Sequence, residues 1–175
     1  MLDAIPIVYE TLYQVIQTES MNKVRKLDRG YWFREECSNS PEEFPYAFLE
    51  QPEATSVVLE KHPSVFTYNI TISLFILTYK DDQTQLFFSR DPNPEARGAV
   101  ELVLDIGGAI FQTYKFGLPY QPRPQGWNVL EWTLGAMRRP RLTELANYLD
   151  NDHTAGAEIE FVFTIIEDGP QLRRR

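Results

Sequence analysis

The chain has 175 residues, of which 43% are hydrophobic and 24% are charged, and this is the composition of a folded globular domain. Its length is typical of one domain with its own core, so we expect residues 1–175 to form a single unit. Lysine and arginine number 17 against 25 aspartates and glutamates, which gives a formal net charge of −8. That charge excludes nucleic-acid binding through a general positive field.

Cysteine content and apolar runs exclude further classes. Cys37 is the single cysteine of the sequence, so an internal disulfide and a CxxC metal or redox site are both excluded. This fits folding in a reducing compartment. No apolar run reaches the roughly 18 residues of a membrane-spanning helix, so no membrane partner is expected. Asp3 stands where a secretion signal carries a positive charge, so we expect no such signal.

The N-terminal quarter predicts one helix followed by an irregular stretch. Residues 4–19 are expected to be helical because apolar residues recur there at helical spacing. These residues are Ile5, Val8, Leu12, Val15 and Ile16. Residues 22–27 fit either a strand or an extension of this helix. Residues 28–45 show no clear period and are expected to form a long loop.

The middle of the chain predicts strands. Residues 46–51 and 56–60 are short strand candidates, and residues 66–79 form the clearest element of the sequence. Apolar and polar side chains alternate there with period two, which indicates a strand with one buried face. The opposite face also becomes apolar at Phe75 and Leu77, so that end is expected to be covered on both sides. After a turn, residues 84–89 are expected to return as a hairpin arm.

The second half predicts one helix and a closing strand. The helix is expected from about Glu95 to Lys115, and Gly107 and Gly108 within it indicate room for close packing on the sheet, with a kink as the alternative. Its expected buried face is Val100, Val103, Gly107, Ile110, Phe111 and Tyr114. Strands are expected at 127–134 and 157–166, a short helix at 142–149, and further long loops at about 80–98 and 116–126. Segregated helices and hairpins predict an α+β fold, in which a mainly antiparallel sheet is packed by an N-terminal and a central helix.

Catalytic and metal-binding signatures do not occur in the sequence. It contains no HExxH, GxSxG or GxGxxG motif. His62 and His153 each stand at an expected turn without a second ligand at metal spacing. Glu35 and Glu36 stand beside Cys37, and their charges disfavour a reactive thiolate. We therefore expect no catalytic activity, no metal and no cofactor.

Two residue groups point to contacts between proteins. Aromatic side chains are frequent in the predicted loops, where they either fold back on the core or contact another subunit. They are Tyr31, Trp32, Phe33, Phe44, Phe116, Tyr120 and Trp127. Arginines gather in the C-terminal third, where they are either solvated or paired with acids of a neighbouring subunit. They are Arg123, Arg138, Arg139, Arg141 and Arg173 to Arg175.

The order of these elements resembles the tail terminator (tail completion) proteins of long-tailed bacteriophages. The resemblance is carried by five segments. They are the amphipathic helix at 5–12, the proline-entered strand at 44–50, the alternating strand at 68–76, the helix at 100–113 and the closing strand at 159–165. Neck proteins that join head to tail share much of this pattern.

The resemblance implies a structural role in the virion. Proteins of this family form a hexameric ring on the last ring of the tail tube, stop tube growth and present a surface to the head-side connector, while DNA passes through the lumen. The implied partners are further copies of the chain, the tail tube protein and the connector or neck protein, with the tail sheath as a further candidate. The implied location is the virion, after assembly in the host cytoplasm. No cofactor and no specific DNA binding are implied.

The same resemblance, combined with charge, gives candidate interface residues. The candidates for subunit or partner contacts are Tyr31, Trp32, Phe33, Arg34, Asp81, Asp82, Asp91, Arg138, Arg139 and Arg141. The candidate lumen acids are Glu35, Glu36, Asp81 and Asp82, because carboxylates repel the phosphates of passing DNA. Two alternatives stay open. One is a neck or stopper protein. The other is a small α+β enzyme or ligand-binding domain, which a pocket gathering His62, His153 or Cys37 with carboxylates would mark.

Overall fold

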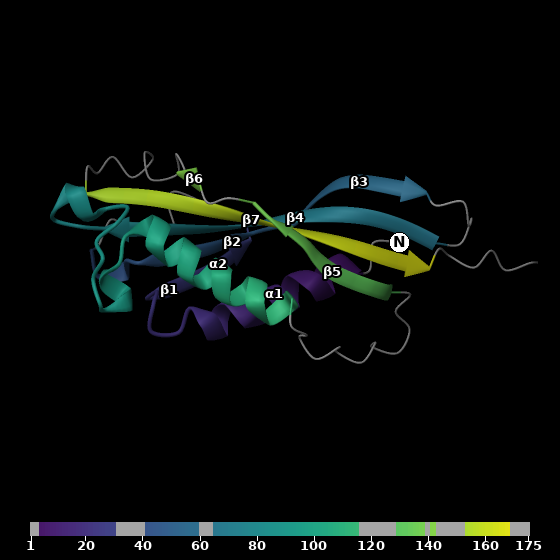
Figure 1. Ribbon diagram of the computed structural model, residues 1–175, viewed down its shortest axis with the longest axis horizontal. Coiled ribbons are helices and arrows are strands. Elements are labelled where there is room, and N and C mark those ends of the chain that lie inside the picture. The colour runs from purple at the N-terminus through teal and green to yellow at the C-terminus, as the bar shows by residue number, and fades with distance from the viewer. Residues whose placement is uncertain are drawn as a thin grey trace, which may run out of the picture.

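The computed structural model describes residues 4–30, 41–59, 65–115, 129–138, 141–142 and 153–168. Within these ranges the chain forms two α-helices and seven strands, shown in Figure 1. In chain order they are α1 (Ala4–Glu19), β1 (Lys26–Gly30), β2 (Tyr46–Glu50), β3 (Glu53–Leu59), β4 (Val65–Tyr79), α2 (Ala99–Lys115), β5 (Val129–Met137), β6 (Arg141–Leu142) and β7 (Thr154–Asp168).

The described strands belong to one mixed sheet. Its order is β1-β2-β4-β7-β5, with β3 also paired to β4 and β6 also paired to β7. β1 and β2 run parallel, and the other pairs are antiparallel. The two long strands, β4 and β7, pair along their whole length, from Val65 opposite Asp168 to Tyr79 opposite Thr154. The predicted α+β fold with a mainly antiparallel sheet and two helices is confirmed.

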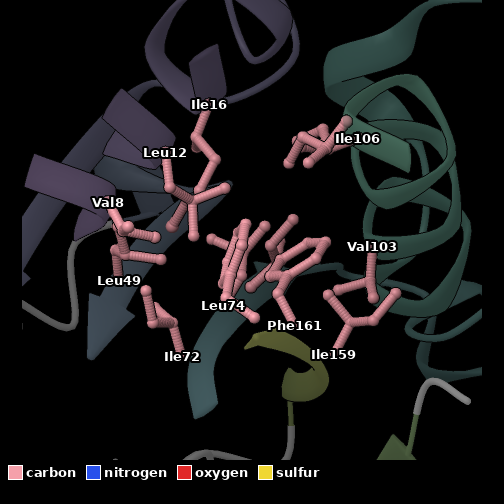
Figure 2. Packing of buried hydrophobic residues seen from close by; sticks show 14 of the residues in the cluster. Val8, Leu12, Ile16, Leu49, Ile72, Leu74, Val103, Ile106, Ile159 and Phe161 are labelled. Carbon is pink, nitrogen blue, oxygen red and sulfur yellow. The ribbon is translucent and has the colours of Figure 1, made fainter. Parts of the chain in front are cut away.

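Both helices pack on one face of this sheet. The inward side chains of β4 from Tyr68 to Ile76 are buried, as are those of β7 from Ala155 to Ile165, because alternate residues of a strand point to the same face. Figure 2 shows Leu12 and Ile16 of α1 meeting Leu74 from one side. Val103 and Ile106 of α2 approach the same cluster from the other side. Burial of this shared cluster supplies the main stabilising free energy of the fold.

The opposite face of the sheet is also partly buried. Phe75 and Leu77 are buried, so the expectation that this end is covered on both sides is confirmed. Glu158 and Glu160 on β7 share this face and are buried as well. Period two alone places these two carboxylates on a wetter face, and so it does not predict their burial.

Several predicted boundaries are wrong. Residues 84–89 form no strand. Their first two residues belong to the 3-10 turn Gln83–Gln85. Helix α2 begins at Ala99 instead of Glu95, because Pro94–Ala96 forms a separate 3-10 turn. The predicted loop at 28–45 is likewise too long at its start, since β1 extends to Gly30.

Two further predictions are tested only in part. Leu142 lies in β6 and not in a helix, and residues 143–149 of the helix expected there lie outside the described residues. Of the expected buried face of α2, Val103, Gly107 and Ile110 are buried, whereas Val100 and Phe111 are half-buried. Leu102 and Ile106, which the prediction missed, are fully buried. Nothing is described for the side chain of Tyr114.

The two adjacent helix glycines have different surroundings. A Cβ atom added at Gly107 would lie 2.7 Å from Cδ1 of Ile159 on β7, so this position does provide close packing on the sheet. A Cβ atom added at Gly108 would meet no atom of the described residues within 4 Å. The interpretation of the glycine pair is therefore confirmed for Gly107 and wrong for Gly108.

This difference predicts opposite effects of the same substitution. Gly108→Ala should raise the free energy of unfolding by up to about 1 kcal/mol, because alanine favours the helix over glycine. Gly107→Ala makes the same helical gain but forces the buried Ile159 to move, and overpacking costs about 1–3 kcal/mol, so it should lower stability. Urea unfolding of the two variants measures both effects. An equal rise for both would show that Ile159 gives way freely.

Candidate interaction site on loop 80–98 and helix α2

The carboxylate of Glu101, the third residue of α2, organises the chain that precedes the helix. It accepts hydrogen bonds from the backbone amides of Gly98 (2.9 Å), Ser89 (2.8 Å) and Arg90 (2.9 Å). The first amides of a helix lack partners within the helix, and a glutamate at the third position commonly satisfies one of them. Here the same side chain also holds two amides of loop 80–98 against the helix.

Backbone bonds complete this attachment. The amides of Ala99 and Val100 donate to the carbonyls of Leu86 (2.9 Å) and Phe87 (3.2 Å). A Cβ atom added at Gly98 would collide with the backbone of Phe87 and Phe88, so only glycine fits at this crossing. The segment expected as a hairpin arm therefore supplies carbonyls to a helix terminus, and the Leu86 carbonyl also accepts a hydrogen bond of 2.9 Å from the hydroxyl of Thr78 on β4.

The electrostatics of Glu101 follow from these bonds. Burial alone disfavours the charged carboxylate, but the amides of Gly98, Ser89 and Arg90 outweigh burial and lower the pKa of Glu101 below its usual range. The lowered pKa means that the ionised form of Glu101 stabilises the fold.

Ion pairs join this region to the turn after α1. Asp105, one turn beyond Glu101, lies 2.7 Å from the guanidinium of Arg97 and 3.7 Å from Nζ of Lys23. Arg25 lies 3.5 Å from the carboxylate of Glu95. Half-exposed pairs of this kind each contribute at most about 1 kcal/mol, so their main effect is to fix the relative positions of the loop, the turn and α2.

A shallow hollow of about 540 Å³ opens between the loop and α2. It is lined by Arg90, Asp91, Pro92, Arg97, Glu101, Leu104 and Asp105. Leu104 is 48% exposed there, and Phe88, which belongs to loop 80–98 just before the lining residue Arg90, is 57% exposed. Arg90 has a positive φ of 55°, which a residue with a side chain rarely adopts, and its amide is held by Glu101.

Three of the predicted contact acids share loop 80–98. Asp81 and Asp82 are exposed on the turn after β4. The side-chain and backbone hydrogen bonds that Asp82 accepts from Thr84 lower the pKa of its carboxyl. Asp91 lines the hollow and accepts a hydrogen bond of 2.8 Å from the amide of Asn93. Asp81, Asp82 and Asp91 therefore share the segment between β4 and α2, and this segment lies at one end of the sheet (Figure 1).

Arg138, another predicted contact residue, lies elsewhere and has a partner in its own chain. Its guanidinium is 2.6 Å from the carboxylate of Glu160, and its amide donates to the Glu160 carbonyl. Glu160 is six residues along β7 from Thr154, which pairs with Tyr79 beside the acidic loop. Six extended residues span about 20 Å, so the structure does not bring Arg138 together with Asp81 and Asp82.

The remaining candidates are described incompletely or not at all. Arg141 stands in β6 opposite Glu158, and only its backbone is described. Tyr31, Trp32, Phe33, Arg34, Glu35, Glu36 and Arg139 lie outside the described residues.

The sequence missed a group of acids on the sheet face away from the helices. Glu50 on β2 is partly exposed, and the desolvation of its carboxyl by neighbouring groups, followed by the charges of Glu158, Glu53 and Glu160, raises its pKa. The two glutamates of β7 show as a polar alternation in the sequence, but their approach to Glu50 depends on the strand order. Because β4 separates β2 from β7, no local signal could reveal it.

His153 is the histidine that the structure describes, and its contacts are structural. Nδ1 of His153 lies 3.0 Å from the carbonyl of Lys80, and its ring packs on Tyr79, so it fixes the start of β7. His62 and Cys37 lie outside the described residues. Among the side chains that are described, no three His, Cys, Asp or Glu residues are grouped to hold a metal ion. No helix in the described ranges is long and apolar enough to cross a membrane.

Comparison with known proteins adds no relative: no protein-family model matches the chain, and no curated protein matches it either.

The role assigned to Glu101 predicts a pH-dependent loss of stability. Glu101→Gln should lower the free energy of unfolding at pH 7 by about 1 kcal/mol, because the neutral amide accepts weaker hydrogen bonds. The pKa of Glu101 is lowered in the folded state. The stabilisation that its ionised carboxylate gives the fold is therefore complete above the unfolded pKa of about 4.3, and it disappears as the pH falls through the folded pKa. Urea unfolding at a series of pH values should show wild type and variant converging in acid. Glu42→Gln, at an exposed site, is the control.

The acids around Glu50 predict a pH dependence of stability opposite to that of Glu101. Its pKa is raised in the folded state, so its ionisation opposes folding at neutral pH, and stability recovers as the pH falls through the folded value. Glu50→Gln should therefore raise the unfolding midpoint at pH 7 and leave it unchanged in acid. A lower midpoint for the variant at pH 7 would contradict the assigned repulsion.

Proposed function

We propose that this chain is a structural virion protein that caps the end of a phage tail tube as a ring, stops tube growth and provides the surface that joins the tail to the head connector. The observation that carries the proposal is the order of its elements. The five segments that resemble tail terminators contribute in turn to α1, β2, β4, α2 and β7. They do so within one α+β unit, as the resemblance requires.

The distribution of charge supports a ring. A closed ring requires two different, complementary patches on each subunit. Asp81, Asp82 and Asp91 share loop 80–98 at one end of the sheet (Figure 1), whereas Arg138 pairs with Glu160, six residues along β7 from the Tyr79 and Thr154 pair that adjoins this loop. The acidic loop is held by Glu101, and a loop fixed before binding loses less entropy in a contact.

The proposed partners follow from this role. They are further copies of the chain, the tail tube protein, the head-side connector or neck protein, and the tail sheath where there is one. Asp81 and Asp82 are exposed, and the chain carries a net charge of −8, so DNA would pass a lumen lined by this loop without binding.

Electron microscopy of the purified protein mixed with purified tail tubes tests the proposal. We expect rings or caps at one end of the tubes, and tubes assembled in the presence of the protein should stop growing. Binding to connectors or completed tails, with bare tube ends ignored, would instead indicate the neck or stopper protein. Protein that binds neither tubes nor connectors would overturn the virion role.

A further inference from the structure

Loop 80–98 is attached to the core at its two ends. The amide of Lys80 donates to the carbonyl of His153 (2.9 Å), so the loop leaves β4 beside the start of β7. At its other end it continues into α2, whose inward side packs on the sheet. Among its large apolar side chains, Leu86 is buried, Phe87 is half-buried and Phe88 is exposed. The chain between the two ends is therefore held mainly by polar bonds.

These polar bonds converge on Glu101. One oxygen of its carboxylate accepts from the amides of Ser89 and Gly98, and the other accepts from the amide of Arg90. The hydroxyl of Ser89 donates to the carbonyl of Ala96 (2.9 Å) and also lies 3.3 Å from the Glu101 carboxylate. Hydrogen bonds to an ionised carboxylate are about twice as strong as those between neutral groups. One side chain of α2 thus binds both the middle and the end of the loop.

The free energy of opening this loop differs in origin from that of unfolding the sheet. Opening exposes one large buried apolar side chain, Leu86, whereas unfolding exposes the whole cluster between the helices and the sheet. Segments with few buried apolar contacts open at a lower free energy than the core. The amides of Ser89, Arg90 and Gly98 share one acceptor group, so they lose their bonds together when the loop leaves Glu101. Both facts favour opening of the loop as one unit while the sheet stays folded.

We propose that loop 80–98 is a strap that opens as one unit, independently of the sheet, and that the carboxylate of Glu101 is the group that keeps it closed. The opening is a property of the free protein. Its importance for assembly rests on the proposed function, in which Asp91 of the strap contacts a partner. A partner that recognises the closed strap binds more tightly when the closed state is more populated, so Glu101 would act as a positioning residue for that contact.

Amide hydrogen exchange of the full-length protein, measured by NMR where the opening equilibrium sets the rate, tests the strap. The amides of Ser89, Arg90 and Gly98 should exchange at similar rates, at least about 100-fold faster than those of Ile70 and Leu74. The two residues of β4 are the reference because strands pair with them on both sides. Exchange of the loop amides should also depend less on urea, since opening exposes less surface. Loop amides that exchange at the rate of the β4 amides would overturn the proposal.

Two variants test the role of the carboxylate. Glu101→Gln should accelerate exchange of the strap about fivefold, because the neutral amide accepts weaker hydrogen bonds. The amide of Ala96 should accelerate equally, although it donates to the carbonyl of Asn93 and not to Glu101. Acceleration confined to the amides that Glu101 accepts would show a local weakening and overturn the role of Glu101. Glu42→Gln, at an exposed site, should leave the rates unchanged. If Glu101→Gln fails to fold, as circular dichroism would show, Ser89→Ala decides, since it removes the hydroxyl bonds and should also accelerate Ala96.

The outcomes separate the strap from the tail role. Capping of tube ends by the wild type is measured in parallel with exchange. Caps formed by a protein whose loop exchanges at the rate of the sheet overturn only the strap. Exchange as expected, in a protein that ignores tubes and connectors, supports the strap and overturns the tail role.

Discussion

The pairing of β4 with β7 is the constraint on which the rest of the structure depends. These strands are far apart in the sequence, yet they pair over 15 positions from Val65 and Asp168 to Tyr79 and Thr154. Every other described strand except β1 pairs with one of these two, and both helices contribute to the core on their common face. Because their register fixes which side chains face the helices, a shift by one residue would expose the whole core face.

The second constraint is the way in which α2 begins. Its first amides donate to Leu86 and Phe87, and Glu101 binds the amides of Ser89, Arg90 and Gly98. The helix packs on the sheet through its inward side, so these bonds connect the core directly to loop 80–98. The position of Asp91 and the hollow beside Leu104 therefore depends on the core and not on the loop sequence alone.

The sequence predicts those parts of the fold that follow one local period. Helix α1, strand β4 and strand β7 were recognisable because their apolar residues repeat every three to four or every two positions. The strand predicted at residues 84–89 is wrong, because the carbonyls of Leu86 and Phe87 accept from the first amides of α2, and no periodicity reveals that contact. The approach of Glu50 to Glu158 and Glu160 depends on strand order, and the intrachain pair of Arg138 with Glu160 depends on the register of β5 against β7. The resemblance and the charge pattern predict Asp81, Asp82 and Asp91 as contact candidates, but the sequence does not predict the hydrogen bonds from Ser89 and Arg90 to Glu101 that hold their loop.

The adjacent glycines connect stability with assembly. Gly107 faces the core, where a methyl group would displace Ile159. Close packing on the sheet therefore offsets the helix stability that this glycine loses relative to alanine. Gly108 faces outward, and no packing contact with a described residue offsets the helix stability that it loses there. Proteins tolerate such a local loss where function needs the position, since selection acts on the working assembly rather than on the isolated subunit.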